Sequence, residues 1–132
     1  GFAEYTYLPP DFYFWATDSS ARLALYRIAR VVRERFFAQN VYVDNFYQDA
    51  LVVTGRAREW LARKPRAPFF LLVHYMDPHD PYMHIPYDGR GIARVTNPHP
   101  PASERDRMHQ LYQENVGYLD EHLATLWQDL RD

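Results

Sequence analysis

The chain has 132 residues, 47% of them hydrophobic and 17% aromatic, a composition typical of one globular domain rather than a disordered tail. Its formal net charge is -2, with 15 basic residues against 17 acidic ones, so no broad positive field favours nucleic acid or an anionic membrane. The absence of cysteine excludes disulfides, thiolate metal clusters and a cysteine nucleophile. No apolar run approaches the ~20 residues that span a bilayer.

The first part of the chain is predicted to be an irregular aromatic segment followed by a helix. Residues 1–17 are rich in aromatic side chains and proline and show no sustained helical or strand period. Thr17 or Asp18 can cap a helix at its N-terminus. The apolar residues that follow at helical spacing are Ala21, Leu25, Ile28, Val32 and Phe36. They predict an amphipathic helix over residues 18–37.

A second helix is predicted over residues 46–63. A possible short strand, 41–43, precedes it, and Asp44 or Asn45 offers a cap. The apolar stripe of this helix consists of Phe46, Ala50, Val53, Ala57, Trp60 and Leu61. The Lys64–Pro65 step ends the helix, because a residue before proline avoids the helical region.

Residues 69–75 form a continuous apolar run, Phe-Phe-Leu-Leu-Val-His-Tyr, bounded by prolines. A run that is too short for a typical helix and does not alternate predicts a strand buried on both faces of a parallel sheet. Such a strand needs parallel neighbours, and the chain supplies at most one weak companion. We therefore expect the missing strands to come from parts of a larger protein.

A long loop and a third helix complete the predicted elements. Residues 77–102 contain six prolines and two glycines, which predict a loop, and loops of this length in compact domains tend to be functional. Ser103 and Asp106 resemble a capping box. Apolar residues at helical spacing then predict a helix over residues 103–131.

Five polar residues gather where the predicted strand ends: His74, Asp77, His79, Asp80 and His84. Ligands of open α/β sheets bind beyond the carboxyl ends of the strands, so this position suits a site. Imidazoles and carboxylates are competent metal ligands, although the spacing matches no usual metal motif. In the alternative interpretation the aspartates shape proline turns, and the histidines, His74 above all, are solvated or packed.

Three stretches resemble the sulfatase family of the alkaline-phosphatase superfamily. The segment 68–82, Pro-Phe-Phe-Leu-Leu-Val-His-Tyr-Met-Asp-Pro-His-Asp-Pro-Tyr, is similar to the family's buried strand and its Asp-Pro-His-x-Pro-Tyr turn. Ala57, Trp60 and Leu61 match the family's preceding helix, and residues 112–120 match the following one. The resemblance covers roughly residues 50–131 and is weaker in the N-terminal third.

The resemblance implies an α/β fold in which three helices and one or two strands form part of an alkaline-phosphatase-like sandwich around a mainly parallel sheet. It implies a hydrolase of sulfate esters, or of phosphate esters in related branches, acting outside the cytoplasm or in the periplasm. His79 matches the family's histidine that lies beside the substrate and can protonate the leaving alkoxide. Tyr82 and His84 are expected to line the substrate pocket. The intact protein would use a divalent cation, commonly calcium, and we expect this segment alone to bind none.

Several parts of the family pattern are absent from the sequence: a Cys/Ser-x-Pro-x-Arg nucleophile segment, an Asp-Asp pair and a later Asp-His-Gly strand. We therefore expect residues 1–132 to be an incomplete segment of a catalytic domain, inactive alone and able to self-associate through surface that the larger protein buries. Two alternatives stay open. One is a protein-interaction module that binds through its aromatic N-terminal third, and the other is a sulfatase relative that has lost catalysis.

Overall fold

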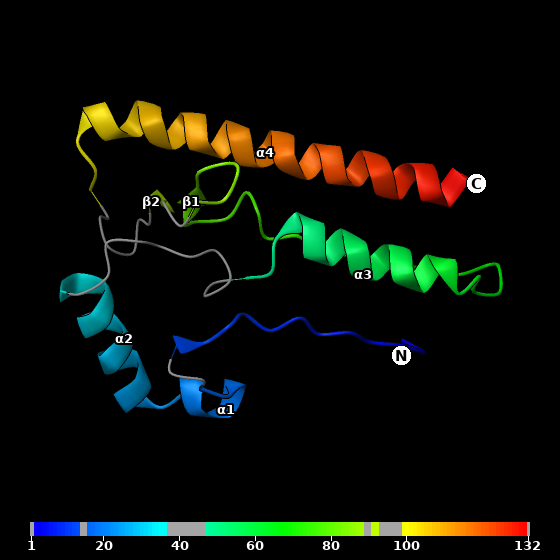
Figure 1. The fold of residues 1–132 in the computed structure, drawn as a ribbon, viewed down its shortest axis with the longest axis horizontal. Coiled ribbons are helices and arrows are strands. Elements are labelled where there is room, and N and C mark those ends of the chain that lie inside the picture. The colour runs from blue at the N-terminus through cyan, green and yellow to red at the C-terminus, as the bar shows by residue number, and fades with distance from the viewer. Residues whose placement is uncertain (1, 14–15, 37–46, 89–90, 93–98, 132) are drawn as a thin grey trace.

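The structure, a computed structural model, describes residues 2–13, 16–36, 47–88, 91–92 and 99–131. Figure 1 shows the C-terminal helix lying along the helix that precedes it in the chain, with a small sheet near one end of this pair. The N-terminal part of the chain lies on the side of the earlier helix that faces away from the C-terminal helix. The elements in chain order are α1 (Asp18–Ala21), α2 (Ala24–Phe36), α3 (Ala50–Ala62), β1 (Tyr82–Met83), β2 (Gly91–Ile92) and α4 (Ala102–Arg131). The predicted strand 41–43 and the caps at Asp44 and Asn45 lie outside the described residues.

The predicted first helix is present as two pieces, α1 and α2. Thr17 caps α1 with a reciprocal pair of hydrogen bonds: its Oγ1 accepts from the Ser20 N–H at 3.3 Å, and Ser20 Oγ accepts from the Thr17 N–H at 2.8 Å. Arg22 and Leu23 separate the two pieces. The apolar stripe of α2 is exposed along its length. The amphipathic pattern therefore predicts the helix correctly, but no described residue covers its apolar face.

Helix α3 begins later than the sequence predicts, at Ala50 rather than at residue 46. Asp49 is its N-cap, and its carboxylate accepts from the Val52 N–H at 3.0 Å. The helix ends at Ala62, one residue before the predicted end at residue 63. Lys64, directly before Pro65, adopts a positive φ of 51°, which does not continue the helix.

Helix α4 covers the predicted range 103–131 and packs along α3 (Figure 1). The buried residues of the two helices are Ala50, Thr54 and Ala57 on α3 and Met108, Leu111, Asn115 and Leu126 on α4. The small side chains on α3 leave room for the larger ones on α4, so the two backbones lie close together. An ion pair between Arg58 and Asp129 joins the helices toward the end of α4.

The segment 69–75 differs from the strand that the sequence predicts. It is extended but belongs to no sheet of the described residues, and it is covered on one face only. The Tyr75 hydroxyl lies 2.9 Å from Thr54 Oγ1, and Phe69 packs edge-to-face on Trp60 of α3 at 5.1 Å between ring centroids. Phe70 and Leu72 point the other way and are exposed. No described strand pairs with this segment, so the predicted parallel sheet stays a prediction.

The only sheet of the described residues lies within the predicted loop 77–102. Strands β1 and β2 pair antiparallel, with Tyr82 opposite Ile92 and Met83 opposite Gly91. A Cβ at Gly91 would meet Met83 Sδ at 2.6 Å and the Tyr82 carbonyl oxygen at 2.8 Å, so the approach requires glycine. Met83 packs with the buried Tyr47, which ties the loop to the chain just before α3.

The described part of the chain is therefore helix-rich, with a small two-stranded antiparallel sheet. None of the helices described is both long and apolar enough to span a bilayer.

Candidate functional site

The candidate site is built on the turn 77–81, which follows the extended segment 69–75. Its first residue, Asp77, is 0% exposed, and its side chain reaches the N-terminus of α3. Asp77 Oδ1 accepts from the Ala50 N–H at 2.7 Å and from the Tyr87 hydroxyl at 3.1 Å. The first N–H groups of a helix have no partner within the helix, and an acidic group is favourable there. The carboxylate therefore fixes the start of the turn to α3.

The main chain of the turn is held from the other side by Tyr47. The Tyr47 hydroxyl donates to the Asp77 carbonyl oxygen at 3.2 Å and lies 3.5 Å from the carbonyl oxygen of Pro81. A backbone hydrogen bond from the His79 N–H to the Met76 carbonyl oxygen, at 2.8 Å, closes the turn. Both ends of the five-residue turn are thus attached to buried groups.

His79 lies on the exposed side of this turn. Its Nδ1 is 2.7 Å from the carbonyl oxygen of Asp80. A carbonyl oxygen only accepts, so Nδ1 carries the proton of this hydrogen bond. Nε2 forms no hydrogen bond with any described residue and is the nitrogen left to meet a ligand. The turn therefore presents one defined edge of the imidazole to the outside.

Burial shifts the acid–base behaviour of the groups beneath His79. It raises the pKa of the Asp77 carboxyl, and the hydrogen bonds from Ala50 and Tyr87 oppose this only in part. Burial also raises the pKa values of Tyr47 and Tyr87, helped by the nearby charge of Asp77. The pKa of Tyr118 rises to about 12 through burial and the charge of Asp49, to which its hydroxyl donates at 3.4 Å. All three phenols are therefore neutral donors at physiological pH.

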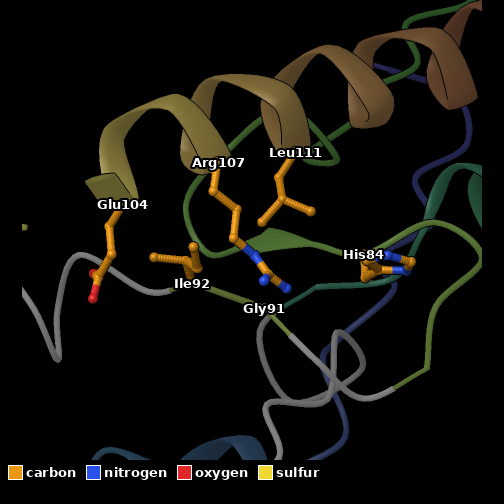
Figure 2. Close-up of a pocket in the computed structure, with 6 residues that line it drawn as sticks. All are labelled: His84, Gly91, Ile92, Glu104, Arg107 and Leu111. Carbon is orange, nitrogen blue, oxygen red and sulfur yellow. The ribbon is translucent and has the colours of Figure 1, made fainter. Parts of the chain in front are cut away.

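A pocket of about 300 Å³ lies between the β1–β2 hairpin and the first turns of α4 (Figure 2). Its lining residues are His84, Gly91, Ile92, Glu104, Arg107 and Leu111. Figure 2 shows the Arg107 side chain extending from α4 toward Gly91, between Ile92 and His84 in this view. Within the part of the chain described, Arg107 takes part in no ion pair. The pocket thus combines the apolar side chains of Ile92 and Leu111 with a guanidinium, an imidazole and the carboxylate of Glu104.

The three residues that the sequence assigns to the site make different contacts in the structure. His84 lines the pocket, whereas His79 lies on the turn and is not among the lining residues. Tyr82 is half-buried on β1, and its ring packs edge-to-face on Tyr112 of α4 at 5.9 Å. His74 is exposed on the extended segment.

Sequence reasoning missed the part of the pocket that α4 supplies. Glu104, Arg107 and Leu111 recur at intervals of three and four, which puts them on one face of a helix, and this spacing was the signal that could have found them. Nothing in the sequence placed that face opposite His84, because the pairing of β1 with β2 is not encoded in a local pattern.

The five-residue polar cluster does not converge on a point. Asp77 turns inward to α3, while His74 and His79 face outward. In the described residues no group of three or more histidines, aspartates or glutamates is arranged to hold a metal ion. The residues described here therefore do not fit the divalent cation that the family resemblance implies, and we derive no chemical step through it.

The described part of the chain is helix-rich and presents an exposed histidine, His79, on a turn attached to buried groups. Comparison with known protein families matches residues 7–132 to the sulfatase family, so this chain belongs to that family. The match includes the N-terminal third, where the sequence motifs are weaker. No curated protein and no solved structure matches the chain.

Proposed function

We propose that this chain forms the leaving-group side of a sulfatase active site, with His79 as the acid that protonates the departing oxygen. Family membership supports the reaction class, and the observation that carries the role is the orientation of the His79 ring. Nδ1–H is held by the Asp80 carbonyl, so Nε2 faces outward. When the S–O bond of the ester breaks, negative charge develops on the alkoxide oxygen. The imidazolium form of His79 transfers its Nε2 proton to this oxygen, which leaves the neutral ring with its proton on Nδ1.

The remaining chemistry belongs to other residues of the active protein. The 132 residues contain neither cysteine nor a Ser-x-Pro-x-Arg segment, so we propose that the nucleophile is supplied from outside this sequence. The divalent cation, calcium in our proposal, would be held there as well. On this proposal the 132-residue chain alone hydrolyses no ester, and measurable turnover by the isolated chain would contradict it.

We assign the pocket lined by His84 and Arg107 to the alcohol part of the substrate, or to a charge that it carries. A cavity of about 300 Å³ lies at the lower end of the range for small-molecule sites, which starts at ~300 Å³. Tyr82, our other proposed substrate residue, supports the same region through its ring contact with Tyr112. A phosphate ester is the related substrate class that the same groups would accommodate.

The extended segment 69–75 is our proposed link to the parallel sheet of an alkaline-phosphatase-like sandwich. Its burial alternates along the chain, it contacts α3 on one face, and it has no pairing strand among the described residues. Phe70 and Leu72 are exposed on its other face, which is the face that a second layer would cover.

A second candidate function, protein association, is favoured by one observation. Helix α2 exposes the large apolar side chains of its stripe, Leu25, Ile28, Val32 and Phe36. Apolar surface of this kind marks interaction sites and promotes self-association. Sedimentation of the 132-residue chain tests it: a concentration-dependent oligomer that Ile28→Asp converts to monomer supports association through α2, and a monomer at all concentrations argues against it.

The decisive experiment for the catalytic role compares His79→Ala with His74→Ala in an active protein that contains this chain. Removing a general acid costs about 10²- to 10⁴-fold in kcat, and the loss is greatest for esters of weakly acidic alcohols. We expect a large loss for phenyl sulfate, a smaller one for 4-nitrophenyl sulfate, and little change with His74→Ala, since His74 is exposed away from the turn. Equal behaviour of the two variants would reject the role.

A further inference from the structure

We infer that Asp77 is a positioning residue for His79: its buried carboxylate ties the turn that carries the imidazole to the N-terminus of α3. The inference rests on the proposed role of His79 and extends it to a residue that contacts no substrate. Asp77 is two positions before His79 in the chain, and its side chain points the opposite way, into the protein.

The first support is that His79 has little else to hold it. The ring is exposed, and its one hydrogen bond to a described residue is to the carbonyl oxygen of the next residue, Asp80. Its direction therefore depends on the path of the main chain from residue 77 to residue 81. That path is fixed by Asp77 Oδ1 at 2.7 Å from the Ala50 nitrogen and by the Tyr47 hydroxyl bonded to the Asp77 carbonyl oxygen.

The second support is that α3 already has an N-cap. Asp49 accepts from the Val52 N–H at 3.0 Å, the bond that N-cap residues ordinarily make. Asp77 adds a second carboxylate from a distant part of the chain and bonds the first residue of the helix instead. Asp77 therefore attaches the turn to the helix, whereas Asp49 caps the helix.

The third support is that stability alone would not favour a buried carboxylate with an unpaired oxygen at this position. Its Oδ2 is buried and has no hydrogen-bond partner in the described part of the chain. Leaving one oxygen of a buried carboxylate unpaired costs free energy of folding. Costs of this kind persist where the surrounding structure serves a site.

Spectroscopy of the 132-residue chain provides the first test, independent of any enzymatic assay. The ¹⁵N shifts of the His79 ring report which nitrogen carries the proton. We expect a protonated Nδ1 in the parent chain and a shift toward the average of the two tautomers in Asp77→Ala. Asp49→Ala is the matched control, because it also removes a carboxylate from the α3 N-terminus but does not touch the turn. Equal His79 shifts in the two variants would overturn the inference.

Kinetics in the active protein provide the second test. A displaced catalytic group can cost about 100-fold in rate, so we expect Asp77→Ala to lower kcat by about 10- to 100-fold. KM is expected to change by less than about threefold, because an interaction made only in the transition state lowers kcat and kcat/KM together. Asp77→Asn retains an oxygen that can accept from Ala50 and Tyr87, and we expect it to restore most of the activity. A loss that Asp49→Ala reproduces would overturn the inference.

Two further variants cover the case in which Asp77→Ala does not fold. Tyr47→Phe and Tyr87→Phe each remove one hydrogen bond that attaches the turn, and both are expected to shift the His79 signals partway. His79 signals identical to those of the parent chain in both would overturn the inference. The outcomes also separate the two proposals. If His79→Ala keeps full activity while Asp77→Ala shifts the His79 signals, the catalytic role alone is rejected. If His79→Ala loses activity while Asp77→Ala has no effect on the His79 signals or on kcat, the positioning role alone is rejected.

Discussion

The N-terminal region, residues 2–36, and the site-bearing body, residues 47–131, are built on the same kind of sequence signal but are held in different ways. Among the described residues, all of the buried hydrophobic ones lie in the body, namely Tyr47, Ala50, Ala57, Met83, Met108, Leu111 and Leu126. None of the described residues before Tyr47 is buried. In the body, α3 and α4 cover each other, whereas α2 has an apolar stripe with nothing described over it (Figure 1).

The contacts between the two regions lie at the surface. Arg63 pairs with Glu4 at 3.1 Å, Gln48 Nε2 donates to the Pro9 carbonyl oxygen at 2.9 Å, and the ring of Phe2 stacks on Phe70 at 6.1 Å. Exposed contacts of this type contribute little free energy each. An amphipathic stripe thus predicts that a helix forms, but the partner of the stripe decides how much the helix contributes to stability.

The largest expected difference is in the free energy of unfolding that is lost when a leucine of each region is replaced by alanine. Leu111 on α4 is 3% exposed and Leu25 on α2 is 76% exposed. A buried leucine replaced by alanine costs about 2–5 kcal/mol in the free energy of unfolding, because it loses burial and leaves a cavity. We expect Leu111→Ala to reach this range in urea denaturation. Leu25→Ala is expected to change stability by less than about 0.5 kcal/mol.

Similar losses for both leucines would break the comparison, because Leu25 would then have to be covered in solution. Repeating the measurement at several protein concentrations locates the cover. A loss at Leu25 that grows with concentration indicates a second copy of the chain on α2, since association stabilises the folded state by mass action.

Asn115 tests how the body holds the loop that carries the site. Its buried Nδ2 donates to the carbonyl oxygens of Met83 at 2.6 Å and Leu111 at 2.7 Å, so it connects β1 to α4. Asn115→Ala removes the side-chain donor that bonds the Met83 and Leu111 oxygens, and we expect a loss of about 1–3 kcal/mol in the free energy of unfolding. Hydrogen exchange of the β1–β2 pair should accelerate. Gln110→Ala, on the exposed side of α4, is the control and should leave both measurements unchanged.

The helices of both regions could be predicted from the sequence because their stripes are long. Helix α4 matches the predicted range 103–131 with its start one residue earlier, and α3 ends one residue before the predicted 63. The start of α3 could not be predicted as well, because Asp44, Asn45 and Asp49 can all cap a helix and the local pattern does not choose among them. The run 69–75 was predicted as a paired strand, and pairing depends on strands that the described residues do not include.

The candidate site was predictable only where a motif carries it. The turn with His79 follows from the Asp-Pro-His-x-Pro-Tyr pattern, but the same pattern gave Asp77 no role beyond shaping the turn. Its burial against Ala50 joins residues 27 positions apart, and Asn115 reaches Met83 from a helix that was read separately in the sequence. Long-range contacts of this kind have no local signature, which is why Arg107 was missed in the pocket as well.

A smaller effect is expected from the pH dependence of the body's buried carboxyl. Burial raises the pKa of Asp77 above its ordinary value of 3.8, so the folded state binds its proton more tightly than the unfolded state does. The stability that this proton contributes is therefore lost as pH rises from 3.8 through the folded-state pKa. Asp77→Asn removes the titration. We expect the urea midpoint of Asp77→Asn to increase relative to that of the parent chain as pH rises from acid to neutral. A gap that stays constant with pH would contradict the raised pKa.

The smallest effect concerns the attachment of the N-terminal region. Arg63→Ala removes the ion pair with Glu4, an exposed pair worth about 0.2–1 kcal/mol. We expect faster proteolysis and hydrogen exchange over residues 2–13, with α3 and α4 unchanged, because the core of the body lies elsewhere. Arg56→Ala is the matched control, since Arg56 pairs with Glu59 on its own helix. If Arg63→Ala loosened α3 and α4 to the same extent as residues 2–13, the two regions would form one cooperative unit, and the difference between them would reduce to exposure alone.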